Sequence, residues 1–376
     1  MRENNKALGE YIRLVDERNR DLSVTKLLGV SINKQFIPSI ANIVGTDLSS
    51  YKIVRTGQFA YGPVTSRNGE KISIALLGES DCIISSSYTV FEVTDKDTLD
   101  PEYLMLWFSR PEFDRYSRYM SHGSVREIFD WDEMCKVELP VPGIEKQREI
   151  VKAYKTISDR IKLKRRINDN LEAQMRAYFS DFQANCGSDQ KTKLKDCSSM
   201  QYGFTETASS QPVGPKFLRI TDVAQSYIDW SGVPYCPISA ENHEKYVLHE
   251  GDVVVARTGA TVGYSKMLGC KIPDAVFASF LVRITPTIAD YKYYMGLEIT
   301  SPKFLEYVQN NAGGSAQPQA NPPLLGEYEL ILPDASLMDN FNDTVKPFLN
   351  AMELNEIEIT HLNNIKEALI EMISSH

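Results

Sequence analysis

The sequence predicts a mixed α/β (α+β) fold in which two similar strand-rich domains are joined by two long helices. Three observations lead to this prediction: the length of the chain, an internal repeat and two heptad patterns. The 376 residues exceed what one hydrophobic core usually serves, so about two domains are expected. The hydrophobic content of 42% is ordinary for a globular protein.

The second half of the chain repeats landmarks of the first at an offset of about 191 residues. Each matched segment is short, but the matches share their order and nearly share their offset. A tandem duplication within one chain therefore predicts two copies of one domain. The matches are 28–31 with 218–221, Gly57 with Gly251, 109–113 with 300–304, Gly123-Ser124 with Gly314-Ser315, and 137–140 with 330–333.

Each copy consists of a strand-rich part followed by a long helix. Alternating apolar runs bounded by turn residues, such as 72–76 and 252–256, predict strands. Shorter helices are expected near 101–120 and 289–310, and a Leu-Pro pair precedes each long helix. The predicted boundaries are a first domain over 1–142, a first helix over 143–184, a second domain over 185–333 and a second helix over 334–376.

Both long helices show an apolar seam with alternating steps of four and three residues, as in a coiled coil. Polar residues interrupt the seam at Lys164 and Asn168 in the first helix, and at Asn355 and Lys366 in the second. Such residues cost stability but can fix register and partner. The apolar seam residues are Ile150, Tyr154, Ile157, Ile161, Leu171, Met175, Tyr178 and Phe182, then Phe341, Val345, Phe348, Met352, Ile359, Leu362, Leu369 and Ile373.

The two helices carry opposite charge. Residues 145–183 hold ten Lys/Arg against six Asp/Glu, whereas residues 334–373 hold two against eight. We expect the helices to pair with each other as an antiparallel coiled coil, with the two strand-rich domains at opposite ends about a pseudo-twofold axis. The alternative is that each helix packs only on its own domain.

Composition limits the classes of function. The six cysteines show neither CxxC spacing nor metal-site spacing to a histidine, which favours reduced structural thiols. No apolar run approaches the roughly 18–20 residues of a membrane span. The first residues lack the apolar part of a secretory signal, so a cytoplasmic location is expected. The net charge of −9 opposes an autonomous nucleic-acid-binding domain, because phosphate neutralisation dominates such binding.

Several segments nevertheless resemble the specificity (S) subunits of Type I restriction-modification systems. In the first half these segments are 48–61, 86–91 and 123–126, and 139–151 is similar to the entry into the family's first spacer helix. That entry usually has an adjacent Glu-Gln, which Lys146 separates here. In the second half the similar segments are 251–254, 257–263 and 313–318, whereas Met338-Asp339-Asn340 stands where a Glu-Gln would open the second helix.

The resemblance implies two target-recognition domains, each reading one half of a bipartite double-stranded DNA target, with the helix pair as a spacer. It also implies two methyltransferase (M) subunits, and motor-nuclease (R) subunits in the full restriction complex. These partners would supply much of the phosphate contact, and the chain itself would be non-catalytic and without a cofactor or metal. The seam residues expected to bind partner subunits are Ile150, Tyr154, Ile157, Leu171, Met352, Leu362 and Leu369.

Base-reading residues are expected in loops, because loops on a rigid scaffold commonly carry function. Arg, Asn, Gln, Ser and Thr are the side chains that read base edges directly. The candidates are Thr65, Ser66, Arg67, Asn68, Ser124 and Arg126 in the first domain, and Arg257, Thr258, Thr261, Ser315, Gln317 and Gln319 in the second.

Two other functions remain as alternatives. Asn321-Pro322-Pro323-Leu324 resembles the Asn-Pro-Pro-aromatic segment with which adenine methyltransferases hold a flipped base, so the chain could be a compact adenine DNA methyltransferase. Leu324 lacks the ring that would stack on adenine, and no Gly-rich strand-to-helix turn for a methyl donor stands out. A coiled-coil scaffold without a DNA role would leave the duplicated domains unexplained.

Overall fold

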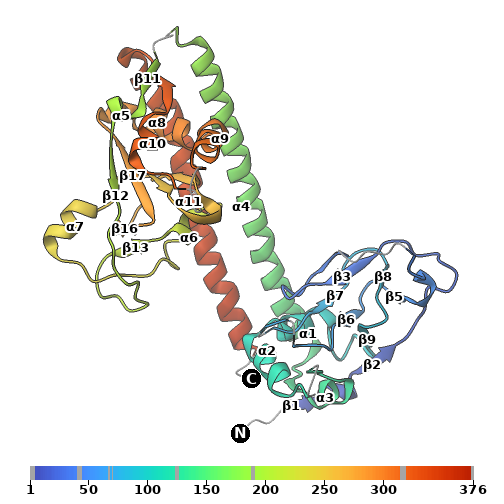
Figure 1. The fold of residues 1–376 in the computed structure, drawn as a ribbon. Coiled ribbons are helices and arrows are strands. Elements are labelled where there is room, and N and C mark those ends of the chain that lie inside the picture. Colours follow the sequence, from blue (N-terminus) through green and yellow to red (C-terminus); the bar gives the residue numbers. More distant parts are fainter. Residues whose placement is uncertain are drawn as a thin grey trace. The chain divides into compact units, whose positions relative to one another are not determined.

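The computed structural model describes residues 5–39, 45–66, 68–69, 71–122, 127–187, 191–313 and 319–373 (Figure 1). The chain forms two compact units. Unit 1 comprises Met1–Arg160 with Leu362–His376, and unit 2 comprises Ile161–His361. The two predicted long helices are present as α4 (Ile144–Asn185) and α11 (Met338–Met372), and each contributes residues to both units.

Unit 1 is built around a four-stranded antiparallel sheet in the order β2-β9-β6-β7. Phe59 and Phe91 pair across β6 and β9 with ring centroids 4.8 Å apart, and Phe108 meets both rings edge-on. The sheet strands are β2 (Ile12–Val15), β9 (Thr89–Val93), β6 (Phe59–Tyr61) and β7 (Ile74–Leu76). Two-stranded ladders are formed by β1 (Asn5–Ala7) with β10 (Glu138–Pro140), β3 (Leu28–Val30) with β4 (Phe36–Pro38), and β5 (Lys52–Val54) with β8 (Cys82–Ile84). The short helices are η1 (Leu8–Glu10), η2 (Leu48–Ser50), α1 (Pro101–Phe108), α2 (Pro111–Tyr119) and α3 (Trp131–Lys136).

Unit 2 contains a sheet of the same size and order, β12-β17-β14-β15, also antiparallel. Its strands are β12 (Ser198–Tyr202), β17 (Leu281–Pro286), β14 (Val253–Ala256) and β15 (Ser265–Met267). Two further ladders join β11 (Lys191–Lys193) to β18 (Glu329–Ile331) and β13 (Lys216–Leu218) to β16 (Ala275–Phe277). The short helices are α5 (Leu194–Cys197), α6 (Ile220–Val223), α7 (Ala240–Tyr246), η3 (Gly259–Thr261), η4 (Ala289–Tyr291), α8 (Lys292–Ile299), α9 (Pro302–Asn311), α10 (Pro322–Gly326) and η5 (Ala335–Leu337).

The four-stranded sheets of the two domains have the same strand order and are both antiparallel, as a duplication predicts. Besides the sheet order, α1, α2 and α3 of the first domain correspond in order to α8, α9 and α10 of the second. The prolines of the repeat matched from sequence open α2 and α9, at the position where a missing N–H costs nothing. Gly57 and Gly251, also matched from sequence, have φ of +88° and +86°, a backbone conformation that favours glycine.

The long helices pair antiparallel within unit 2. Phe182 and Tyr178 of α4 contact Phe341 of α11 with centroids 4.7 and 5.8 Å apart, whereas Asn168, further back along α4, contacts Asn355, further on along α11. Both helices also pack on the domain core, since Met175, Phe179 and Phe341 belong to the largest apolar cluster. Helix pairing and packing on the domain therefore occur together.

The first turn of α4 is fastened to unit 1 by Gln147, the glutamine of the predicted helix-entry signature. Its side chain is fully buried. The amide oxygen accepts the N–H of Asp100 at 2.9 Å, and the amide nitrogen donates to the carbonyls of Thr98 and Pro142 at 3.0 and 2.7 Å. This glutamine holds the helix to the domain and satisfies backbone groups beside α1. At the start of α11 the buried Met338 provides an apolar contact instead.

Candidate DNA interface

Two loops that are far apart in the sequence meet in the first domain. One loop follows β6 and the other lies between α2 and α3. The N–H of Thr65 donates to the carbonyl of Glu127 at 3.0 Å, and the N–H of Phe129 donates to the carbonyl of Pro63 at 2.9 Å. The hydroxyl of Thr65 also donates to Oγ of Ser121 at 2.9 Å. The loops therefore form one supported edge of the domain.

The second domain repeats this arrangement. The N–H of Ala320 donates to the carbonyl of Arg257 at 2.8 Å. Thr258 and Gln319 form an isolated antiparallel β-bridge, and Val64 and Ile128 form the same kind of bridge in the first domain. The loop after β14 thus meets the loop between α9 and α10. In both domains the predicted base-reading residues belong to these two loops, which the fold brings together.

The predicted residues of the first domain differ in their accessibility. Thr65 is only 2% exposed, and its hydrogen bonds lie within the domain, so it shapes the turn. Asn68 is half-buried and closes the same turn through its N–H to the carbonyl of Thr65 and its side chain to the carbonyl of Val64. Ser66 is exposed. Arg67, Ser124 and Arg126 lie outside the described residues.

In the second domain Gln319 is exposed, whereas Arg257, Thr258 and Thr261 are half-buried. Arg257 rests over the ring of Tyr202, with its guanidinium carbon 4.6 Å from the ring centroid, and its Nη1 donates to the carbonyl of Ser279 at 3.2 Å. Ser315 and Gln317 lie outside the described residues.

Sequence reasoning missed two residues beside Arg257. Tyr202 ends β12 and Phe280 precedes β17, and both rings are substantially exposed. Both read as ordinary apolar strand residues in the sequence, because their exposure depends on which strands become neighbours.

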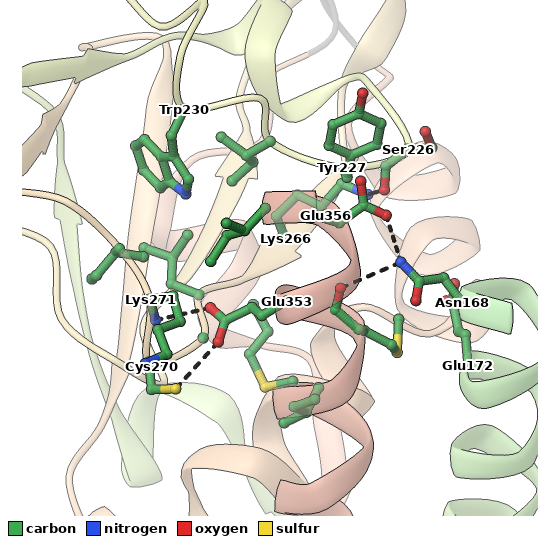
Figure 2. A pocket seen from close by; sticks show the side chains of 18 of the residues that line it. Asn168, Glu172, Ser226, Tyr227, Trp230, Lys266, Cys270, Lys271, Glu353 and Glu356 are labelled. Carbon is green, nitrogen blue, oxygen red and sulfur yellow. Dashed lines mark hydrogen bonds between the residues drawn. The ribbon is translucent and has the colours of Figure 1, made fainter. Parts of the chain in front are cut away.

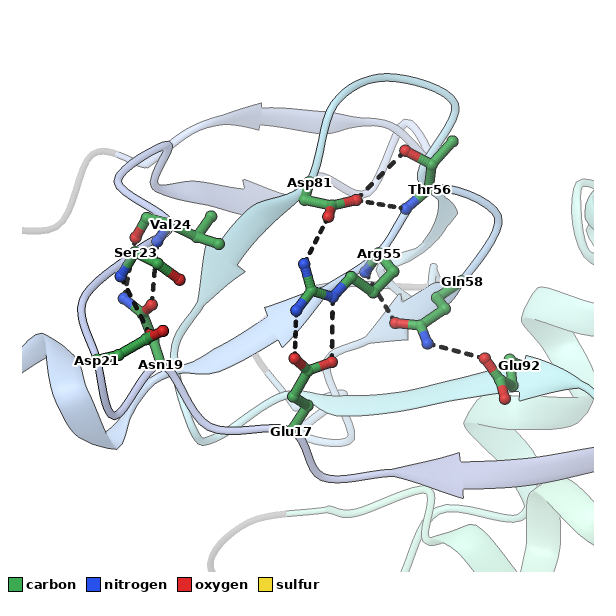
Figure 3. A network of polar contacts seen from close by, with 10 residues as sticks. All are labelled: Glu17, Asn19, Asp21, Ser23, Val24, Arg55, Thr56, Gln58, Asp81 and Glu92. Carbon is green, nitrogen blue, oxygen red and sulfur yellow. Dashed lines mark hydrogen bonds and ion pairs between the residues drawn. The ribbon is translucent and has the colours of Figure 1, made fainter.

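A polar network in the first domain contains an arginine, Arg55, whose charge is already paired with carboxylates (Figure 3). Arg55 forms ion pairs with Glu17 and, at 2.7 Å, with Asp81, which raise the pKa of the guanidinium. Asp81 also accepts the N–H of Thr56 at 3.0 Å, and its pKa is lowered, chiefly by the bond to Arg55. Gln58 extends the network to Glu92 at 2.8 Å. Because two carboxylates neutralise Arg55, this cluster ties strands together and is a poor phosphate site.

A cavity of about 1040 Å³ lies in unit 2 between the second domain and the helices α4 and α11 (Figure 2). Lys266 donates to the carbonyl of Ser226 at 2.7 Å, and burial lowers its pKa. Glu353 of α11 accepts the N–H of Lys271 at 3.0 Å and the thiol of Cys270 at 3.2 Å. The two contacts of Glu353 attach a surface loop of the domain to α11. Among the described residues no group of three or more His, Cys, Asp and Glu is placed to hold a metal.

The predicted partner-binding residues of the helix seam are half-buried. Ile150 and Tyr154 pack on the core of the first domain, and Met352 packs on that of the second. The remaining four are also of intermediate exposure: Ile157, Leu171, Leu362 and Leu369. Other apolar side chains of the same helices are much more exposed, namely Leu163, Ile167, Leu354, Ile357 and Ile365.

The Asn-Pro-Pro segment has a structural role. Asn321 is the N-cap of α10, and its side-chain oxygen accepts the N–H of Leu324 at 2.9 Å. Pro322 and Pro323 occupy the first turn of that helix, where proline is well tolerated. The side chain that would hold a flipped adenine is thus engaged in capping, and the methyltransferase alternative is not supported.

Comparisons with known proteins point to one family of DNA specificity domains. Residues 35–173 match the family model of the Type I restriction modification DNA specificity domain. No curated protein matches the chain. Across the part of the chain that the structure describes, no helix is long and apolar enough to cross a membrane.

Solved structures match over nearly the whole chain. The S subunit of a Type I restriction-modification system from M. genitalium is 11% identical, with a TM-score of 0.60, covering 99% of this chain and 97% of that one. The HsdS subunit from Thermoanaerobacter tengcongensis is 15% identical, with the same coverage and a TM-score of 0.38.

Residues 35–173 are thus similar to Type I restriction modification DNA specificity domains, and the chain as a whole shares the fold of the S-subunit structure from M. genitalium.

Proposed function

We propose that this chain is the non-catalytic specificity subunit of a Type I restriction-modification complex. Each strand-rich domain reads one half of a bipartite DNA target through its pair of loops. The observation that carries this proposal is the repetition of one loop arrangement in two domains of one chain, with the bridge Val64–Ile128 in the first and Thr258–Gln319 in the second. Two similar readers on one chain suit a target with two separated segments.

Partner subunits would make the acidity of the chain compatible with DNA binding. A net charge of −9 cannot supply the phosphate neutralisation on which DNA affinity depends. In this proposal two methyltransferase subunits enclose the DNA and carry the basic surfaces, and the S subunit contributes base contacts. Phosphate contacts position a protein on the duplex, whereas base contacts specify the sequence. The isolated chain should therefore bind DNA weakly and with little sequence preference.

The long helices are the proposed docking surface for the methyltransferase subunits. The predicted seam residues are half-buried, and Ile150, Tyr154 and Met352 among them pack on the domain cores. Leu163, Ile167 and Leu354 present exposed apolar side chains on the same helices and are available to a partner. Motor-nuclease subunits would join this assembly in the full restriction complex. The methyl group, and the pocket for the extruded adenine, would belong to the methyltransferase.

Co-expression with the methyltransferase encoded beside it, followed by methylome sequencing of the host, tests the proposal. The expected result is methyladenine in a split motif with a non-specific gap, which depends on the presence of this chain. The proposal would be contradicted if a stable complex forms but no methylation appears in a host known to contain every candidate split motif. Binding of a methyl donor by the purified chain alone would revive an enzymatic function.

A further inference from the structure

An exposed aromatic face lies beside the loop pair of the second domain. Tyr202 is the last residue of β12, Arg257 directly follows β14, and Phe280 directly precedes β17. Tyr202 is 41% exposed and Phe280 is 57% exposed. These three residues come from neighbouring strands, because the sheet order places β17 between β12 and β14.

Arg257 contacts the backbone of Phe280 and the ring of Tyr202. Its N–H donates to the carbonyl of Phe280 at 3.0 Å, continuing the pairing of Ala256 with Leu281 by one position. Its guanidinium donates to the carbonyl of Ser279 and lies against the ring of Tyr202. The exposed aromatic residues therefore lie at strand ends. The backbone of Phe280 is held by a hydrogen bond, and the ring of Tyr202 contacts the guanidinium of Arg257.

This face is continuous with the candidate DNA interface. The carbonyl of Arg257 accepts the N–H of Ala320, and the next residue, Thr258, bridges Gln319. The aromatic rings and the two loops thus share one edge of the domain. A ligand that lies along the loops would also reach the rings.

The first domain lacks aromatic residues at the equivalent positions. The shared sheet order and the two equivalent loop bridges place Asp16, Pro63 and Ser87 where the second domain has Tyr202, Arg257 and Phe280. Asp16 and Ser87 are also exposed. Exposure at this edge is therefore common to both domains, whereas the aromatic character is specific to the second.

Aromatic rings on a DNA-reading edge have a recognised physical use. A ring can stack on a base, and an apolar side chain can enter a base step that has been unstacked. Extruding a base for methylation costs unstacking energy, which a wedge that fills the vacated space lowers. Solvent exposure of two large rings is otherwise unfavourable for the free protein.

We propose that Tyr202 and Phe280 form an aromatic wedge that stacks on an unstacked base step in the half-target read by the second domain. The proposal rests on the proposed function, since it requires that this domain read DNA. It assigns the two domains different ways of engaging their half-targets: the second with a wedge, and the first without one.

The test uses the full chain in complex with its methyltransferase and a duplex containing the split motif. 2-Aminopurine, whose fluorescence rises on unstacking, replaces one base at a time in both half-targets. We expect the wild-type complex to raise the fluorescence at a step next to the methylated adenine of the second domain's half. Phe280→Ala and Tyr202→Ala should each reduce that signal and weaken binding of the duplex about five- to a hundredfold, the range for loss of base–aromatic stacking.

Ser87→Ala, at the position of the first domain equivalent to Phe280, is the matched control and should leave both signals unchanged. Phe280→Leu keeps apolar bulk without the ring and should retain part of the affinity. Because the ring of Phe280 is mostly exposed, its removal leaves the core intact, which circular dichroism checks.

Three results would overturn the wedge: wild-type fluorescence and affinity in both alanine variants, a change confined to the half-target of the first domain, or loss of the methyltransferase subunits from the Phe280→Ala complex. The last result would show that the face binds protein. Absence of a split motif for the wild-type complex would instead refute the proposed function itself.

Discussion

Replacement of Asn355 by leucine should break a buried polar layer in the helix pair of unit 2. Asn355 and Asn168 are 8% and 7% exposed. The amide nitrogen of Asn355 donates to Oδ1 of Asn168 at 2.7 Å, and Lys164 donates to Oδ1 of Asn355 at 2.8 Å. Lys164 also forms an ion pair with Glu358 at 2.8 Å. The side chains of Asn168, Asn355 and Lys164 are all hydrogen-bonded, although the surrounding seam is apolar.

The expected cost follows from the partners left behind. In Asn355→Leu the Oδ1 of Asn168 loses its donor inside the seam, whereas Lys164 keeps Glu358. A buried acceptor without a donor costs about 1–3 kcal/mol, so the free energy of unfolding should fall by that amount. Asn168→Leu should have a similar effect, because it leaves the amide of Asn355 unpaired. In the double variant both partners of the Asn168–Asn355 hydrogen bond are removed, so neither amide of this pair is left unpaired, and the loss should be smaller than the sum of the two single losses.

Urea unfolding of the four proteins, followed by circular dichroism at the helix band, measures this double-mutant cycle. The reasoning requires a coupling free energy of at least about 1 kcal/mol between the two asparagines. If the two single effects simply add, or if each single variant is as stable as the wild type, the layer is not a coupled unit. In that case Asn168 and Asn355 would be independent polar residues that the seam tolerates.

Three further outcomes follow from the structure. Phe341→Ala removes a fully buried ring that contacts the aromatic rings of α4, and should lower the free energy of unfolding by about 3–5 kcal/mol in urea titrations. Burial raises the pKa of Glu356, so the stability tied to its protonated form is present at acidic pH and lost as the pH rises through the folded-state pKa. Glu356→Gln should therefore stabilise the protein at neutral pH, with the gain vanishing below the ordinary glutamate range; an equal gain at all pH values would contradict this. Gly203→Ala would place a Cβ 2.1 Å from the carbonyl oxygen of Ala278, and a thermal melt should show a clear loss of stability beside the aromatic face. An unchanged melting temperature would mean that the strand end yields to admit the methyl group.

Much of the architecture could be predicted because it depends on periodic patterns. The heptads predicted α4 and α11, and the polar breaks at Lys164, Asn168 and Asn355 are indeed neighbours in one layer. The repeat predicted two domains of one topology, since short matches in a common order are hard to produce without duplication. The Asn-Pro-Pro segment was recognisable as a poor methyltransferase signature because a leucine stands in place of the required aromatic residue, and in the structure it opens α10.

The details of the candidate interface could not be predicted, because they depend on which loops and strands become neighbours. Thr65 was expected to face DNA, yet the second loop of its domain covers it. Tyr202 and Phe280 have the apolar character of core residues, and only their positions at strand ends expose them. The role of Gln147 was visible only as a family signature, since two of its three hydrogen bonds, to Asp100 and Thr98, reach segments 47 and 49 residues away.

Replacement of the first domain tests most directly whether each domain reads its own half of the target. Residues 1–142 would be exchanged for the corresponding domain of another S subunit whose target is established, and the methylome of the host carrying the chimaera and its methyltransferase would be sequenced. The account predicts that one half of the split motif changes to that of the donor, while the other half and the methylated adenine within it are retained. A change in both halves, or in neither, would contradict the claim that each domain reads its own half of the target.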